Sequence, residues 1–176
     1  AFRNAQVRPL YPETAGWRVK AMSLRFADTR WPIGADFIKD ADIVFLTEGM
    51  PDLLAVACAA FLEDPDRILS GIGFCCMTGS KQRIAPDALK QFRNKHVRIL
   101  AHNDESGSLA RSYWSKQLQP YAASVDIWMS EIKGEDFNDW ASRHWSKSKD
   151  GFTLPESIIP TTKKPAAGTT GSELKY

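Results

Sequence analysis

A short apolar run that ends in an acidic turn and leads at once into a helical pattern constrains the fold of this chain more than any other feature. The run is Ile43–Thr47, Glu48 and Gly49 form the turn, and Pro51 follows at the start of the helical pattern. Proline suits this position because the first N–H groups of a helix have no partner within it. The same arrangement recurs further along the chain, where the apolar run Val97–Ala101 is followed by an acidic stretch. Such units build open α/β sheets, in which ligands bind at the strand ends.

Two further apolar runs complete a regular alternation of strands and helices. We expect strands at 43–47, 72–77, 97–101 and 125–129. Helical spacing of apolar residues follows Pro51 and Pro86, and a third stripe comes after Gly107, made of Leu109, Tyr113, Trp114, Leu118 and Tyr121. Short connections between alternating strands and helices imply right-handed crossovers and a mainly parallel sheet with helices on both faces. The sequence therefore predicts an α/β fold with about four strands.

The segments on either side of this alternation differ from it in pattern. Two apolar runs at 7–11 and 17–26 flank the turn-forming residues 12–16, which is typical of a β-hairpin. We expect this hairpin and a connector at 1–40, a main domain at 41–146, and a tail or linker without periodicity at 147–176. Because the chain begins without Met in what reads as a strand, we expect it to be cut from a longer protein with partner domains.

Composition excludes some classes of protein and leaves others open. With 43% apolar residues among 176 the chain can bury a proper core, and no apolar stretch reaches the length of a membrane span. Its 23 basic and 21 acidic residues nearly balance, so nucleic-acid or phosphate binding would come from local patches such as the one with Lys81 and Arg83. The three cysteines lack metal-ligand or disulfide spacing and are expected to be reduced core thiols in a cytoplasmic protein.

Acidic side chains gather at the predicted strand ends. Glu48 and Asp52 follow the first strand, Asp104 follows the third and Asp136 the fourth. In a parallel sheet these ends lie at one edge, where neighbouring carboxylates repel one another and a divalent cation relieves the repulsion. Mg²⁺ is commonly held by one or two carboxylates together with substrate phosphate oxygens. The pattern predicts a site for Mg²⁺ or Mn²⁺ that serves phosphoryl or nucleotidyl transfer.

The main domain also resembles a known family. It is most similar to the Toprim domains of bacterial and phage DNA primases and primase-helicases, over about residues 41–142. The resemblance is carried by four motifs in the family's order, which are Thr47-Glu48-Gly49-x-x-Asp52, the glycine turn at Gly79, His102-x-Asp104-x-x-Gly107 and Gly134-x-Asp136-x-Asn138. It implies a Toprim, Rossmann-like fold.

The resemblance further implies roles for the site residues. Glu48 would act in acid/base chemistry or metal binding, while Asp52, Asp104 and Asp136 would bind Mg²⁺, with Asn138 at the place of a further site acid of primases. The implied activity is metal-dependent nucleotidyl transfer in primer synthesis, with DNA and nucleoside triphosphates as partners. It involves other primase or helicase domains of a longer chain, so this domain alone is expected to be inactive. The alternatives are a non-catalytic nucleic-acid or nucleotide-binding module and a Toprim-type nuclease.

One residue departs from the family pattern. His102 stands where the family's Asp-x-Asp pair has its first aspartate. A neutral imidazole suits Mn²⁺, Zn²⁺ or Fe²⁺ better than Mg²⁺, whereas a protonated imidazole repels any cation. Two interpretations follow, an altered metal preference with His102 among the ligands, or a degenerate site that keeps the fold and binds phosphates. Purely local roles are also open, because Glu48, Asp104 and Asp136 all stand where a carboxylate stabilises a helix N-terminus.

Overall fold

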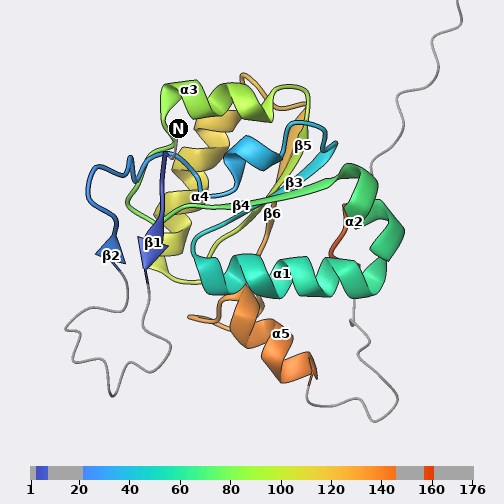
Figure 1. The fold of residues 1–176 in the computed structure, drawn as a ribbon. Helices are drawn as coiled ribbons and strands as arrows, with labels where there is room; N and C mark the ends of the chain where they lie inside the picture. Colours follow the sequence, from blue (N-terminus) through green and yellow to red (C-terminus); the bar gives the residue numbers. More distant parts are fainter. Residues whose placement is uncertain (1–2, 8–21, 146–156, 161–176) are drawn as a thin grey trace, which may run out of the picture.

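A four-stranded parallel sheet forms the centre of the protein (Figure 1). The structure is a computed structural model that describes residues 3–7, 22–145 and 157–160. The strands of this sheet are β3 (Ile43–Thr47), β4 (Ile72–Cys76), β5 (His96–Leu100) and β6 (Ser124–Trp128). All neighbouring pairs are parallel, and the order across the sheet is β4-β3-β5-β6. This is the Rossmann-like α/β fold that the sequence predicted.

The strand order places a topological switch point between β3 and β5. From β3 the chain goes to β4 on one side and then returns to β5 on the other side of β3. Thr47 and Leu100, the last residues of the two strands, are paired in register. In open parallel sheets ligands bind in the crevice outside the strand ends at such a point. The segments that follow β3 and β5 therefore meet where a binding site is expected.

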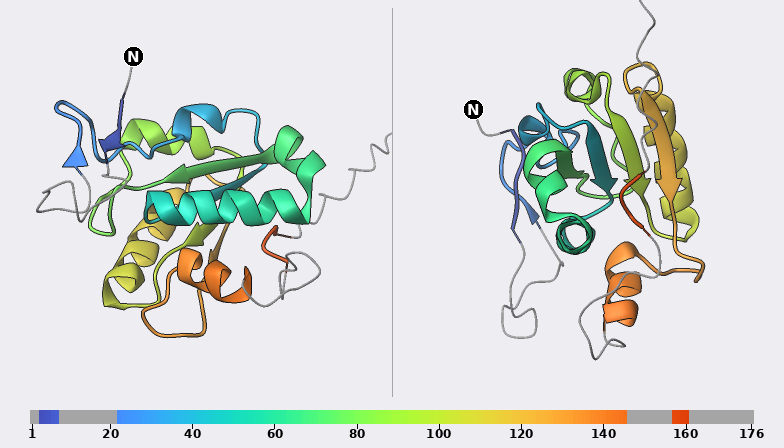
Figure 2. Two further views of the ribbon diagram at one scale, coloured as in Figure 1. Left: turned by 60° about the horizontal axis from the view of Figure 1, so that its bottom comes forward. Right: turned by 90° about the vertical axis from the view of Figure 1, so that its right-hand side faces the viewer.

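Helices cover both faces of the sheet (Figure 2). One face packs against the 3₁₀ helix η1 (Ala35–Phe37), the short α3 (Pro86–Leu89) with η2 (Lys90–Phe92), and α4 (Glu105–Leu118). The other face packs against α1 (Met50–Glu63) and α5 (Phe137–Trp145). A further helix, α2 (Pro65–Gly71), joins α1 to β4. No described helix has the length and apolar character needed to cross a membrane.

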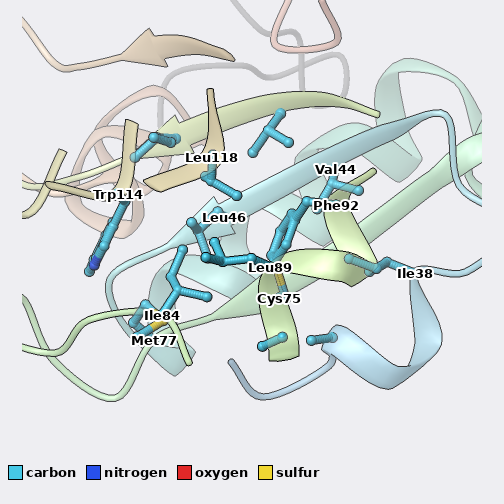
Figure 3. Close-up of a cluster of buried hydrophobic side chains, with 14 of the residues drawn as sticks. Ile38, Val44, Leu46, Cys75, Met77, Ile84, Leu89, Phe92, Trp114 and Leu118 are labelled. Carbon is cyan, nitrogen blue, oxygen red and sulfur yellow. The ribbon is translucent and has the colours of Figure 1, made fainter. Parts of the chain in front are cut away.

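Side chains of β3 alternate between two hydrophobic clusters, one on each face. Val44 and Leu46 belong to the larger cluster, which also contains Phe92 and Trp114 (Figure 3). Phe45 belongs to the other cluster and stacks on Phe74 of β4 with ring centroids 5.6 Å apart. All five β3 residues are buried, which is why this strand reads as a continuous apolar run.

The observed elements agree with the predicted strands to within one residue at each end, but three helical details differ. The helix predicted after Pro86 is only a short α-helix continued by 3₁₀ geometry, and α2 was not predicted. On α4 the buried stripe is Gly107, Ala110, Trp114 and Leu118, whereas Leu109 and Tyr113 are exposed. The predicted stripe was wrong at these two positions because several apolar residues of α4 permit more than one helical face. Cys75 and Cys76 are buried free thiols as expected, but Cys58 is exposed.

The N-terminal extension lies against the edge strand β4. The short strands β1 (Gln6–Val7) and β2 (Met22–Ser23) pair antiparallel, as a hairpin requires, while its predicted turn at 12–16 lies outside the described residues. The connector forms an antiparallel bridge from Ile33 to Cys76 at the end of β4. Next to this bridge, Gly34 has φ +90°, and a Cβ there would lie 2.5 Å from the Phe74 carbonyl oxygen. Only glycine fits so close to the strand.

A short C-terminal stretch, residues 157–160, packs on the α1 and α5 face. Ile158 and Ile159 are buried in the cluster of that face, although the surrounding segment has no periodicity. The Glu63 carboxylate at the end of α1 accepts hydrogen bonds from the Ile158 and Ile159 N–H groups, at 2.9 and 3.3 Å, and from the Ser157 hydroxyl. Glu63 thus attaches the stretch to the domain.

Replacing Glu63 by alanine is expected to lower the free energy of unfolding by about 1 kcal/mol, because the exposed carboxylate takes part in hydrogen bonds to backbone donors. Thermal unfolding should show a decrease of about 2–4 °C in Tm. Glu131→Gln, which changes an exposed acid in the loop after β6, is the control and should leave Tm almost unchanged. Equal Tm values for Glu63→Ala and the control would contradict the proposed attachment.

Candidate metal and phosphate site

A cleft of about 350 Å³ opens at the carboxyl ends of β3 and β5. Five predicted site residues line it, namely Glu48, Asp52, His102, Asp136 and Asn138. Three further segments complete its wall: the turn from β3 into α1 with Gly49, Met50 and Pro51, the glycine turn after β4 with Thr78 and Gly79, and β1 with Gln6. Segments that are far apart in the sequence therefore converge on one cleft at the switch point.

Within the cleft, Asp52, His102 and Asp136 form the cluster that could hold a metal ion. One ligand atom from each of these residues lies within 4.8 Å of the other two. The His102 Nε2 atom lies 3.3 Å from Asp52 Oδ2 and 3.8 Å from Asp136 Oδ2. Two carboxylates and an imidazole are ligands that suit Mn²⁺ or Zn²⁺. No other group of three such ligands occurs among the residues that the structure describes.

Asp52 is the buried member of this cluster. It lies in the first turn of α1, is only 3% exposed, and accepts a hydrogen bond from the Asn138 N–H at the start of α5 over 3.2 Å. This hydrogen bond joins the N-terminal ends of α1 and α5. Asp52 therefore has two roles, since one carboxylate oxygen holds α5 in place and the other faces His102.

His102 carries the compensating positive charge of the cleft. Its hydrogen bond with Asp52 is the main cause that raises its pKa from 6.5 to about 9, and the charges of Glu48, Asp52 and Asp136 add to the effect against the cost of burial. The imidazole is therefore protonated at neutral pH when no metal is bound. In this state the positively charged His102 ring lies among the carboxylates of Glu48, Asp52 and Asp136 and reduces their mutual repulsion, as a bound divalent cation would.

Glu48 lines the same cleft and follows β3 directly. Its side chain is 8% exposed, and among the described residues its Oε2 atom has no hydrogen-bond partner. Burial raises the pKa of this carboxyl, while the charge of His102 and a hydrogen bond from Ser80 act in the opposite direction. A buried carboxylate oxygen without a partner is costly, so a cation or a donor group of a ligand is favoured there.

Asp104 does not belong to the three-residue cluster, although it was predicted to anchor the metal. Its Oδ1 atom accepts hydrogen bonds from the Gly107 N–H at 2.7 Å and from the Ser106 hydroxyl at 3.2 Å, and it caps α4. The Gly107 hydrogen bond is the main cause that lowers the pKa of Asp104. The charge of Asp104 nevertheless raises the pKa of Glu48, which indicates that both side chains lie at the same edge of the sheet.

Asp136 combines a structural and a site role. Its Oδ1 atom accepts the Asp139 N–H at 2.7 Å and so caps α5, while its Oδ2 atom faces His102. Burial is the main cause that raises the pKa of Asp136. From the sequence, capping of a helix and metal binding were alternative roles for Asp136. The geometry allows its carboxylate to do both, with one oxygen for each role.

A hydrogen-bond network around Asn103 holds the loop that carries Asp136 beside His102, and its residues were not among the predicted site residues. Asn103, between two motif residues, donates from its side chain to the Ser130 carbonyl oxygen at 2.9 Å. Its backbone carbonyl accepts the Gly134 N–H at 2.7 Å. Glu135 in the same loop is held by the Ser130 hydroxyl and by Arg143. The only sequence signal was the position of Asn103 inside a motif, because its partners belong to a loop distant in the sequence.

The basic residues divide into two groups. Lys81 and Arg83 line a smaller pocket of about 210 Å³ next to the cleft, where the Arg83 guanidinium lies 3.1 Å from the centroid of the Tyr113 ring. Ser80 and Ser106 line the same pocket. In contrast, Lys95 is buried and donates to the Ala41 carbonyl oxygen, and Arg98 pairs with Asp126 across the sheet. Lys81 and Arg83 are therefore better placed to bind a phosphate than Lys95 or Arg98.

The site and the fold together define a class of protein, an α/β domain with an acidic site that contains a histidine at the switch point of a parallel sheet. No protein-family model matches the chain, and no curated protein matches it.

Proposed function

We propose that this chain is a Toprim domain of a primase or primase-helicase-like protein, which binds a divalent cation and nucleotide phosphates in the cleft. The observation that supports it best is the convergence of Asp52, His102 and Asp136 in the cleft that Glu48 also lines, where the Glu48 Oε2 atom has no partner among the described residues. In the proposed reaction a growing strand and a nucleoside triphosphate meet at this cleft. Further polymerase elements come from partner domains.

The donor set favours Mn²⁺ over Mg²⁺. Asp52 and Asp136 supply hard oxygen ligands, and His102 supplies a nitrogen once it has lost its proton. When bound, the cation neutralises phosphate charge at the reacting centre. Glu48 is the proposed acid/base residue, because burial holds its pKa above the ordinary value and its free oxygen can accept a proton from a substrate hydroxyl. Lys81 and Arg83 bind the phosphates that extend beyond the cleft.

Thermal unfolding with and without Mn²⁺ tests the metal site. Saturating Mn²⁺ should stabilise the protein by about 2.7 kcal/mol at a hundred times Kd, which corresponds to several degrees in Tm. Asp52→Asn should abolish the shift, because it removes a ligand charge. His102→Asp should enlarge the shift with Mg²⁺, because a carboxylate replaces a protonated imidazole. Asp87→Asn, an exposed acid on α3, is the control and should leave both shifts unchanged.

A metal shift of equal size in Asp52→Asn and Asp87→Asn would contradict the proposed site. Activity is tested separately with the domain joined to its polymerase partners, in a primer-synthesis assay with Mn²⁺. There Glu48→Gln should abolish primer formation while leaving the Mn²⁺ shift in Tm in place, if Glu48 acts as acid/base residue rather than as a ligand.

A second candidate function is a non-catalytic module that binds nucleic acid or nucleotide. It is favoured by the protonated His102, which already balances part of the acidic charge of the cleft without a metal ion. Binding of a nucleotide that is equally strong in EDTA and in Mn²⁺, together with no primer synthesis, would support this module. Mn²⁺-dependent nicking of plasmid DNA would instead support the nuclease alternative.

A further inference from the structure

A second and larger cavity, of about 700 Å³, lies between the residues just before β1 and the connector. Its wall combines aromatic, amide and charged side chains with a stretch of connector backbone, and it consists of Arg3, Asn4, Trp31, Pro32, Ile33, Gly34, Asp36 and Phe37. None of these residues takes part in the metal cluster. The cavity is large enough for a nucleotide-sized ligand.

Two buried polar atoms in this wall have no partner within the described residues. Asn4 is 9% exposed and Trp31 is 4% exposed. The Asn4 Nδ2 atom donates to the Trp31 carbonyl oxygen at 2.7 Å, and this orients the amide so that its Oδ1 atom is the free acceptor. The Trp31 Nε1–H is a free donor. A ligand that donates to one and accepts from the other would remove the cost of both unpaired atoms.

Flat surfaces border the same cavity. The Phe37 ring is 90% exposed, which is unusual for a large apolar side chain and leaves its face free for stacking. The Arg3 guanidinium lies 3.9 Å from the centroid of the Trp31 ring. Because Arg3 is itself exposed, it can move off the ring and open the way to the buried donor and acceptor. A planar group with a donor and an acceptor on one edge fits this combination, and nucleobases have that chemistry.

The N-terminal segment 4–6 connects this cavity to the acidic cleft. Asn4 lines the cavity, and Gln6, two residues further, lines the cleft with Glu48 and Asp52. Two residues of chain span at most about 7 Å. This is the scale of a single nucleotide, so one nucleotide can have its base in the cavity and its phosphate toward the cleft.

We propose that this cavity binds a nucleobase, either of a free nucleotide or of a nucleotide within a single strand, through Asn4, Trp31 and stacking on Phe37. The direction of the phosphate rests on the proposed function of the cleft, but recognition of the base does not. The site would hold the base of the nucleotide whose phosphate lies in the acidic cleft.

Proton–nitrogen correlation spectra of the tryptophan indole groups test this proposal. The Trp31 signal is identified by its loss in Trp31→Phe. Titration of the whole chain with adenosine or cytidine 5′-monophosphate in EDTA should shift this signal, whereas ribose 5-phosphate, which has no base, should not. Phe37→Ala should weaken binding at least about fivefold, as expected for loss of base stacking. Phe26→Ala is the matched control, because Phe26 is 91% exposed and does not line the cavity.

The titration is repeated with a six-nucleotide single strand to separate the two sources of the base. Tighter binding of the strand than of the mononucleotides would identify a strand as the ligand, and the reverse would identify a free nucleotide. An unchanged Trp31 signal with all of these probes, an equal shift with ribose 5-phosphate, or equal affinities of Phe37→Ala and Phe26→Ala would overturn the proposal. Since the titration contains no metal, its result is independent of the Mn²⁺ test of the cleft.

Discussion

Replacing Gly107 by alanine is expected to destabilise the protein by about 3 kcal/mol or more, since it forces an extra group into a fully packed position. A Cβ at this position would lie 2.1 Å from the His102 carbonyl oxygen and 2.9 Å from the His102 carbonyl carbon and nitrogen. All three are backbone atoms and cannot move aside as the end of a side chain can. Thermal unfolding should show Tm lower by about 6–12 °C.

The same substitution should also disturb the cleft. The His102 backbone can separate from α4 only if the loop between β5 and α4 moves, and this loop carries the His102 side chain of the cleft. Ser108→Ala is the matched control, since Ser108 is the next residue of α4 and is exposed. It should leave Tm nearly unchanged. A Gly107→Ala protein with the Tm of the control would show that α4 does not pack on the His102 backbone as described. Close packing against the His102 backbone therefore requires glycine at position 107, whatever the chemistry of the cleft.

Raising the pH from about 6 to about 9 is expected to remove roughly 1–3 kcal/mol of stability that depends on His102. The pKa of His102 is about 9 in the folded protein, against an ordinary value of 6.5. A group whose pKa is raised by folding contributes its full stabilisation below the unfolded pKa. The contribution is then lost as the pH rises through the folded pKa. Urea unfolding at several pH values measures it.

The control for this prediction is His102→Gln, which keeps a polar side chain but cannot be protonated. Its stability should fall less than that of the wild type over the same interval, and the difference between the two proteins isolates His102 from the buried thiols. Burial raises the pKa of Cys76 to about 12, so the thiols also reduce stability at alkaline pH. Parallel pH profiles for the two proteins would contradict the pairing of His102 with Asp52 and Asp136.

The sequence predicted the sheet better than the helices. The strands β3 to β6 were found because each is a short apolar run between turn residues, and β3 agrees at both ends. The helix α2 was missed because Asp64 and Pro65 read as the end of α1, although Pro65 also begins a new helix. The exposed face of α4 was partly mistaken for its buried face, since which apolar residues point inward depends on the layer that covers them.

For the site, the sequence determined which residues lie at the strand ends, and only the tertiary structure decided which of them meet. Strand periodicity and turn residues are local properties, so Glu48, His102 and Asp104 could be placed at one edge from the chain alone. The meeting of Asp52 with His102 and Asp136 depends on the strand order, on the packing of α1 beside α5 and on the loop before α5 that Asn103 holds. These are set by packing between segments far apart in the sequence, and a local pattern carries no measure of such distances.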